Sequence, residues 1–263
     1  MRYFDSHAHY YDGRFTDETV ESADKLIGAL LSSTVSAIVN VGTSPETSRL
    51  AIEQAKCHPN MYTAIGIHPY DANFLLDGMD ESIAEIESLI KNPENKCVAL
   101  GEIGLDYHYE GYDETLQKEY FEAQMRLAEK LSVPVVIHDR DAHGDVMEII
   151  RKYPRVKGVM HSYSGSVEMA EELIKLGYMI SFSGTLTFKN ARKTPEVALI
   201  TPRDKVLIET DAPYLAPHPH RGKINHSGYL EYTNARLAEI WGISEEECAE
   251  ITDANARRFF GIK

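Results

Sequence analysis

The stretch Cys97-Val98-Ala99-Leu100-Gly101-Glu102 is a short apolar run that ends on a carboxylate. Four more runs stop at residues that bind metal ions, and these stops are His7-Ala8-His9, His138, His161 and Glu209-Thr210-Asp211. In barrels built from parallel strands, the carboxyl ends of all strands meet at one face. The repeated pattern therefore predicts parallel strands that deliver ligands to a common rim, and so a metal site.

About eight strand-like runs alternate with helix-like stretches along the chain. The predicted strands are residues 3–7, 37–41, 62–67, 97–102, 134–138, 157–161, 178–182 and 205–209. The predicted helices, with apolar residues at three-to-four spacing, are residues 19–31, 45–56, 80–90, 116–131, 146–152, 167–176, 229–241 and 244–259. This alternation predicts an α/β fold, a single-domain (β/α)8 TIM barrel over residues 1–263. A doubly wound open sheet is the rival, but no Gly-rich phosphate loop follows the first strand.

Composition narrows the class of protein but not the substrate. The chain is 43% hydrophobic and 26% charged, as expected of a globular protein, and its formal charge is −14. This charge argues against a broad basic nucleic-acid surface, although bound divalent metals can invert the local field at a site. We expect no membrane segment, no secretory signal and no obligate protein partner. Three scattered cysteines form no disulfide framework, which fits the cytoplasm.

Six residues at the strand ends are candidate metal ligands, namely His7, His9, Glu102, His138, His161 and Asp211. Two histidines two apart on a strand share a face, so both imidazoles can reach one ion. Glu102 can bridge two ions, and Asp211 can accept a proton from bound water, so these two are the candidate catalytic residues. Six ligands suit two ions better than one tetrahedral ion. The alternatives are hydrogen-bonded histidines, a capping or salt-bridged glutamate, and an Asx turn at Asp211.

Four residues are candidate substrate contacts, namely His68, Arg140, Tyr163 and Arg221. His68 closes the third predicted strand without a partner at ligand spacing, so substrate contact and a structural role are both open. The two arginines lie in loops at the same end, and arginine forks suit phosphate oxygens, although each could be a salt-bridge partner. Tyr163 could stack on a base or fill a loop. Gly104-Leu105-Asp106 is expected to form a turn after Glu102, with Asp106 as a turn residue.

The sequence around these residues forms an ordered series of motifs. They are Asp5-Ser6-His7-Ala8-His9, Gly66-Ile67-His68-Pro69, Gly101-Glu102-Ile103-Gly104-Leu105-Asp106, Pro134-Val135-Val136-Ile137-His138, His161-Ser162-Tyr163-Ser164-Gly165-Ser166 and Glu209-Thr210-Asp211-Ala212-Pro213-Tyr214-Leu215. The series resembles that of the TatD-like metal-dependent deoxyribonucleases, which belong to the amidohydrolase superfamily. Arg221-Gly222-Lys223 with Asn225, and Asn255 with Phe259-Phe260, extend the resemblance over essentially the whole chain.

The resemblance implies a (β/α)8 barrel that hydrolyses phosphodiester bonds in DNA. By the same resemblance, His7, His9 and Asp211 would hold one metal, and Glu102, His138 and His161 the second, with Glu102 bridging. The chain departs from the family pattern at Ser227, where proline is usual, at Ser162-Tyr163 in place of cysteine-phenylalanine, and at Asp139. These departures affect loop shape and substrate preference and leave every ligand in place.

Three functions follow as hypotheses. The leading one is a deoxyribonuclease with two divalent ions, Mg²⁺, Mn²⁺ or Zn²⁺, acting on DNA that is single-stranded or at strand ends. The alternative is an amidohydrolase-type hydrolase of a small amide, lactone or phosphoester. A bridging lysine is common in such barrels, so Glu102 favours the nuclease. The third is a binding protein with a structural metal, which a cysteine-free set of six ligands disfavours.

Overall fold

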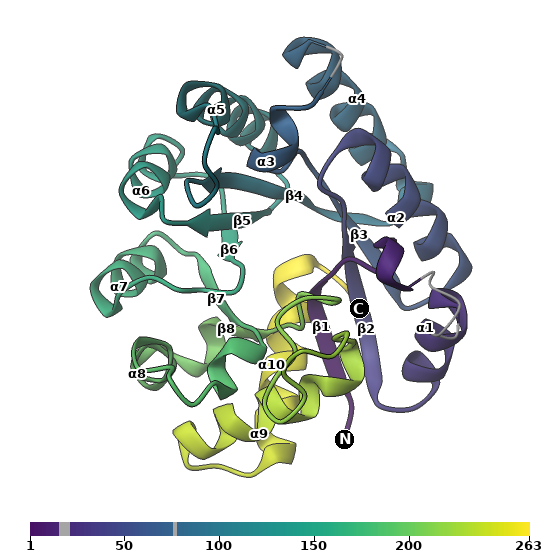
Figure 1. Ribbon diagram of the computed structural model, residues 1–263, viewed down its shortest axis with the longest axis vertical. Coiled ribbons are helices and arrows are strands. Elements are labelled where there is room, and N and C mark those ends of the chain that lie inside the picture. The colour runs from purple at the N-terminus through teal and green to yellow at the C-terminus, as the bar shows by residue number, and fades with distance from the viewer. Residues whose placement is uncertain (16–21, 76–77) are drawn as a thin grey trace.

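The computed structural model describes residues 1–15, 22–75 and 78–263. Within those residues, eight parallel strands pair in the order β1-β2-β3-β4-β5-β6-β7-β8, and helices surround them (Figure 1). The strands are β1 (Tyr3–Ala8), β2 (Val35–Val41), β3 (Met61–Ile65), β4 (Cys97–Asp106), β5 (Val135–Arg140), β6 (Gly158–Met160), β7 (Met179–Phe182) and β8 (Val206–Ile208). The predicted strands are all present, with ends shifted by a few residues.

The sheet closes on itself between its first and last strands. The backbone N–H of Asp211 donates to His7 O at 2.9 Å, and that of His9 donates to Ala212 O at 2.7 Å. These bonds lie just beyond β8, so the barrel is closed at the carboxyl end of the strands. The predicted (β/α)8 barrel is confirmed, and the closing bonds join the segments that carry three candidate ligands.

The helices fill the connections that the sequence pattern indicated. They are α1 (Ala23–Ser32), α2 (Pro45–Cys57), α3 (Pro69–Ala72), α4 (Met79–Lys91), α5 (Glu114–Leu131), α6 (His143–Lys152), α7 (Val167–Lys175), α8 (Lys193–Ile200), α9 (Leu230–Trp241) and α10 (Glu245–Phe260). Helices α3 and α8 were not predicted, because α3 has only four residues and the apolar residues of α8 do not gather on one face. Residues 19–21 of the first predicted helix lie outside the described residues.

The barrel interior is packed with small and branched apolar side chains drawn from every strand. These side chains are Phe4, Ala37, Val39, Val41, Ala64, Ala99, Val136, Val159, Met179 and Leu207. Helix α10 covers the amino-terminal end of the strands, where the ring of Phe260 stacks on that of Phe4 at 5.9 Å. Asn255 Nδ2 also donates to the carbonyls of Arg203 and Val206, where β8 begins. The interior is therefore a solid core, which leaves the opposite end for a site.

Strand β4 continues four residues past the predicted end at Glu102. At Gly104 the backbone has φ +140°, and an added Cβ would collide with the carbonyl oxygen of His138 in β5. Glycine lets the two strands approach closely here, so pairing continues to Asp106 opposite Arg140. The prediction of a turn at Gly104 is wrong, because Gly104 and Leu105 lie in the strand, while Asp106 ends the strand and its Oδ1 accepts the backbone N–H of His108 at 2.9 Å where the chain leaves it.

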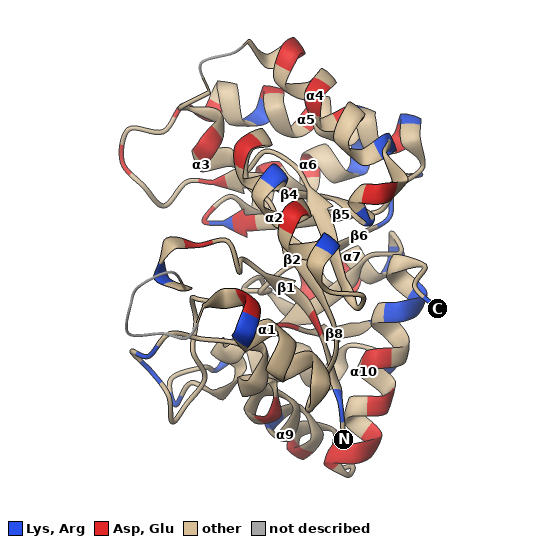
Figure 2. Cartoon of the chain, turned by 90° about the vertical axis from the view of Figure 1, so that its right-hand side faces the viewer, with Lys and Arg blue, Asp and Glu red and all other residues tan. Residues whose placement is uncertain are grey.

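Charges are mixed over the surface. In the view of Figure 2, Lys and Arg positions are interspersed with Asp and Glu positions among the described residues, and this side of the molecule is not uniformly basic. Across the described ranges, every helix is too short or too polar to cross a membrane.

Candidate metal centre

A pocket of about 770 Å³ opens at the carboxyl ends of the strands. It is lined by five of the six candidate ligands, His9, Glu102, His138, His161 and Asp211. The sixth, His7, is fully buried beside them. Residues from the ends of β1, β4, β5, β6 and β8 thus converge on one place, as the parallel-strand argument predicts.

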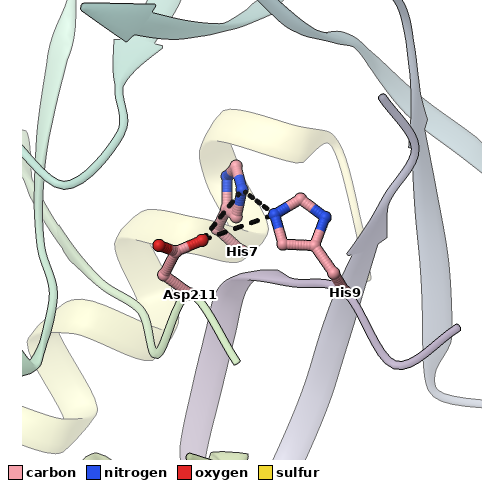
Figure 3. A group of neighbouring side chains, drawn as sticks. All are labelled: His7, His9 and Asp211. Atoms are coloured by element: carbon pink, nitrogen blue, oxygen red, sulfur yellow. Dashed lines mark hydrogen bonds and ion pairs between the residues drawn. The ribbon is translucent and has the colours of Figure 1, made fainter. Parts of the chain in front are cut away.

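His7, His9 and Asp211 form one compact group (Figure 3). The Nε2 atoms of the two histidines are 3.0 Å apart. Asp211 Oδ1 lies 3.7 Å from His7 Nε2 and 3.4 Å from His9 Nε2. The backbone of Asp211 has φ 57°, a left-handed conformation that the closing hydrogen bonds hold in place.

Glu102 lies between this group and the remaining histidines, and its two oxygens face different partners. Oε2 is 3.3 Å from His7 Nε2 and 3.7 Å from His9 Nε2. Oε1 is 2.9 Å from His138 Nδ1 and 3.2 Å from His161 Nε2. A single buried carboxylate thus connects two sets of imidazoles.

Three of the histidines are anchored by a hydrogen bond at the ring nitrogen that faces away from the cluster. His9 Nδ1 donates to Val41 O at 2.7 Å, and His161 Nδ1 donates to Glu209 Oε1 at 2.8 Å. His138 Nε2 lies 3.1 Å from Asp106 Oδ2. Such outer partners fix the orientation of each ring, and in the neutral ring they place the proton on the outer nitrogen and the lone pair on the inner nitrogen.

His68 differs from these three histidines. Its Nδ1 accepts the backbone N–H of Tyr70 at 3.1 Å, so the neutral ring carries its proton on Nε2. That Nε2 lies 3.8 Å from Glu102 Oε1 and faces the pocket. Burial and the neighbouring His138 lower the pKa of His68 to about 3, which keeps the ring neutral. His68 therefore presents a hydrogen-bond donor and no lone pair.

The donor set fits cations. His7 Nδ1 is buried without a hydrogen-bond partner among the described residues, while His7 Nε2 faces His9 Nε2 and two carboxylates. These are acceptors facing acceptors, an arrangement that costs free energy unless protons or metal ions lie between them. Imidazole nitrogens with carboxylate oxygens form a set that Zn²⁺ and Mn²⁺ accept readily.

The ligand atoms form three close groups. These are His7 with His9 and Asp211, His7 with Glu102 and His161, and His68 with Glu102 and His138. The resemblance instead pairs His138 with His161. Because His68 offers no lone pair, the geometry of the third group alone does not make it a metal site.

Burial and charge act in opposite directions on the titration of the cluster. Burial lowers the pKa of His161, but the carboxylates of Glu209 and Glu102 outweigh it and raise that pKa to about 10. Burial would raise the pKa of Glu102, yet the surrounding histidines hold it well below its ordinary value. Glu102 is therefore ionised at neutral pH and provides a negative field for cations.

A buried carboxylate below the cluster ties β1 to the segment after β8. Asp5 accepts Thr210 N–H at 3.0 Å, Thr210 Oγ1–H at 2.6 Å and Ser227 Oγ–H at 2.6 Å. Asn225 Nδ2 in turn donates to Thr210 O at 2.8 Å. Ser227, one of the departures from the family pattern noted in the sequence, supplies one of these hydrogen bonds. This network fixes the backbone on both sides of His7 and Asp211.

The four predicted substrate contacts lie in different surroundings. His68 and Arg140 line the pocket, and Arg140 lies against Tyr109. Tyr163 also borders the pocket, but it is 3% exposed and its hydroxyl donates to Ser166 O at 2.7 Å, which favours packing over stacking. Arg221 is not among the described residues that line the pocket, and its guanidinium lies 3.7 Å from the Phe188 ring centroid.

Sequence reasoning missed two carboxylates that bond to candidate ligand histidines, namely Asp106 and Glu209. A signal was present for both. Glu102 and Asp106 are four apart, and Glu209 and Asp211 two apart, which are spacings that place side chains on one face of a strand. To recognise Asp106, β4 had to be expected to continue through Gly104. To recognise both, each candidate ligand histidine had to be expected to have a second residue that orients its ring.

Comparison with known proteins finds relatives over essentially the whole chain. The sequence matches the family described as TatD related DNase over residues 4–261. It is 40% identical over 261 residues to the uncharacterized metal-dependent hydrolase YabD of Bacillus subtilis (strain 168), covering 98% of this chain and 99% of that protein. It is 35% identical over 265 residues to the uncharacterized metal-dependent hydrolase TatD of Mycobacterium tuberculosis, covering 98% and 97%.

A solved structure also matches essentially the whole chain. The crystal structure of YJJV, a TatD homologue from Escherichia coli K12, matches with a TM-score of 0.88 at 28% identity, covering 100% of this chain and 99% of that chain. The barrel fold agrees with that structure, and the sequence matches extend over essentially the whole chain. The chain belongs to the TatD-related DNase family of metal-dependent hydrolases.

Proposed function

We propose that the protein is a deoxyribonuclease that uses two divalent ions bridged by Glu102. The observation that carries the proposal is the division of the Glu102 oxygens between two sets of histidines, with Oε2 facing His7 and His9 and Oε1 facing His138 and His161. A carboxylate that bridges two ions through both oxygens directs one oxygen to each ion. An isolated structural ion would not require this arrangement.

The ligand assignment follows from the same distances. His7, His9 and Asp211 with Glu102 Oε2 would hold one ion, and His138 and His161 with Glu102 Oε1 the second. Two ions so placed would activate water and neutralise charge on a phosphodiester. Mg²⁺, Mn²⁺ and Zn²⁺ are the candidates, and the imidazole content favours Mn²⁺ or Zn²⁺.

The chain's own residues then have distinct tasks. Asp211 is ionised, because its histidine neighbours hold its pKa below the ordinary value in spite of burial, so it can accept the proton of the attacking water. His68 would donate its Nε2–H to a phosphate oxygen. Arg140, at the pocket wall, would bind a neighbouring phosphate.

The case for DNA rests on the family and on the shape of the site. The family is described as TatD related DNase, and the pocket of about 770 Å³ opens at the candidate ligands. The net charge of −14 disfavours extended contact with duplex backbone. Single strands or strand ends are therefore the proposed substrates.

The test is cleavage of end-labelled single- and double-stranded DNA with Mg²⁺, Mn²⁺ and Zn²⁺ in turn. The wild-type protein should cleave DNA with at least one ion, and Glu102→Ala should abolish that cleavage because both ion sites lose a shared ligand. Glu94→Ala, at an exposed position away from the pocket, is the matched control. Undiminished cleavage by Glu102→Ala would contradict the mechanism.

A second function is favoured by the pocket volume. About 770 Å³ lies within the range of sites that enclose one small molecule. The same ligands would activate water against a small amide, lactone or phosphoester. Turnover of such compounds, with no cleavage of DNA under any of the three ions, would select this alternative.

A further inference from the structure

The exposed aromatic side chains of the described residues gather at the pocket mouth. Tyr70, Tyr109 and Tyr214 line the pocket and are 46%, 48% and 43% exposed. Phe74, with 64% exposed, lies 5.1 Å from Tyr70 between ring centroids. Exposed rings gathered at one opening, rather than scattered singly, indicate a binding surface.

These rings form two platforms, each with an arginine against a tyrosine. In the Tyr109 platform, Tyr70 lies 5.5 Å from Tyr109, and the Arg140 guanidinium lies 5.3 Å from the Tyr109 ring centroid. In the Tyr214 platform, the Arg14 guanidinium lies 4.0 Å from the Tyr214 ring centroid. Arg14 and the Tyr214 hydroxyl both bond to Asp12, which holds that ring in place.

The two platforms border opposite sides of the metal cluster. Tyr70 and Tyr109 follow β3 and β4, and the backbone of Tyr70 holds His68. Tyr214 follows β8, and its ring centroid is 6.2 Å from that of His9. The strand order separates β3 and β4 from β8 and β1, so the candidate ligands lie between the platforms.

We propose that the Tyr109 and Tyr214 platforms stack the two unpaired bases that flank the phosphodiester held at the metal cluster. The proposal rests on the proposed function and specifies its substrate as an unpaired strand. Aromatic faces bind bases of any sequence, and Arg140 supplies positive charge for the strand's phosphates. Arg14 is paired with Asp12 and supports the Tyr214 ring. Paired bases in a duplex are stacked on each other, so their faces are not accessible to these rings.

The experiment compares binding and cleavage of two oligonucleotides of equal length. One is single-stranded oligo(dT), and the other replaces every thymidine with a tetrahydrofuran abasic unit, which keeps the phosphates but removes the bases. The variants are Tyr109→Leu and Tyr214→Leu, which keep apolar bulk without an aromatic face. Tyr109→Phe keeps the ring, and Leu199→Ala alters an exposed apolar residue outside the pocket lining. Metal content is measured for every variant, so that loss of ions is recognised.

The proposal predicts that each leucine variant loses roughly tenfold or more in affinity for oligo(dT) but much less for the abasic strand. Affinity is measured by fluorescence anisotropy with phosphorothioate linkages that resist hydrolysis. Tyr109→Phe should retain the preference for bases. Equal losses on both strands, no loss on either, or a wild-type protein that does not prefer bases would overturn the proposal.

The outcome is separable from that of the proposed function. If the wild-type protein cleaves no DNA but shows a preference for bases that the leucine variants lose, the nuclease proposal fails and the platforms stand. If the wild-type protein cleaves DNA, and the leucine variants bind and cleave oligo(dT) and the abasic strand as the wild type does, the stacking proposal fails and the nuclease proposal stands.

Discussion

Glu209 shows how a single residue outside the ligand set can govern the site. It is buried, and its Oε1 accepts both His161 Nδ1–H and Ser162 N–H at 2.8 Å. Replacing it with glutamine keeps the size but removes the negative charge that holds the His161 ring. Glu209→Gln should weaken binding of the ion at His161 by about 10- to 100-fold, as measured by calorimetric metal titration. Exposed Glu196→Gln is the control, and equal affinity in both variants would contradict this role.

His68 gives a second prediction at the residue scale. Its Nδ1 is occupied by Tyr70 N–H, so it acts as a donor and not as a ligand. His68→Asn should lower DNA cleavage by about 10²-fold, a typical loss for one lost donor to developing charge, while metal stoichiometry stays that of the wild type. His58→Asn, at the end of α2, is the matched control. Loss of one equivalent of metal in His68→Asn would show instead that His68 is a ligand.

Single residues also show how much of the site could be predicted from the sequence. The six candidate ligands were found because each follows an apolar run, and the structure brings all six together. Arg221 was assigned to the pocket from its place in a loop, yet it lies over Phe188 outside the pocket lining. Loop position follows from tertiary packing, which local patterns do not encode. Tyr70 was not proposed because its exposure depends on where α3 lies.

At the scale of elements, strand β4 determines the geometry around His138 and His161, the two histidines that face Glu102 Oε1. The strand reaches Asp106 because Gly104 lets it approach β5. Gly104→Ala should destabilise the protein by ~1–3 kcal/mol more than Gly111→Ala, as measured by urea unfolding. Gly111 is the matched control, since it also has positive φ (82°) but an added Cβ would meet nothing within 4 Å. Equal losses of stability in Gly104→Ala and Gly111→Ala would mean that the contact of the added Cβ with His138 O does not destabilise the protein.

Element boundaries were predicted less well than element types. The end of β4 was placed at Glu102 because Gly104 was taken as a turn signal, whereas a close strand approach also requires glycine. Helix α8 escaped notice because it lacks an apolar face, although the barrel architecture requires a connection there. In both cases the deciding contact comes from a distant segment.

At the scale of the whole molecule, the barrel separates stability from chemistry. The interior core and α10 occupy one end, where Asn255 and Phe260 anchor the last helix under β1 and β8. The ligands, the pocket and the exposed tyrosines occupy the other end. The sequence could predict this division because eight strand–helix units have few other ways to bury their apolar faces. The positions of the loops that shape the pocket required the structure.

The central claim is that two ions share Glu102, and the most direct measurement is electron paramagnetic resonance of the Mn²⁺-loaded protein together with metal analysis. We predict two equivalents of Mn²⁺ per chain and a spectrum of two exchange-coupled ions, with the coupling lost in Glu102→Gln. A single equivalent, or two equivalents with uncoupled spectra in the wild-type protein, would contradict the account.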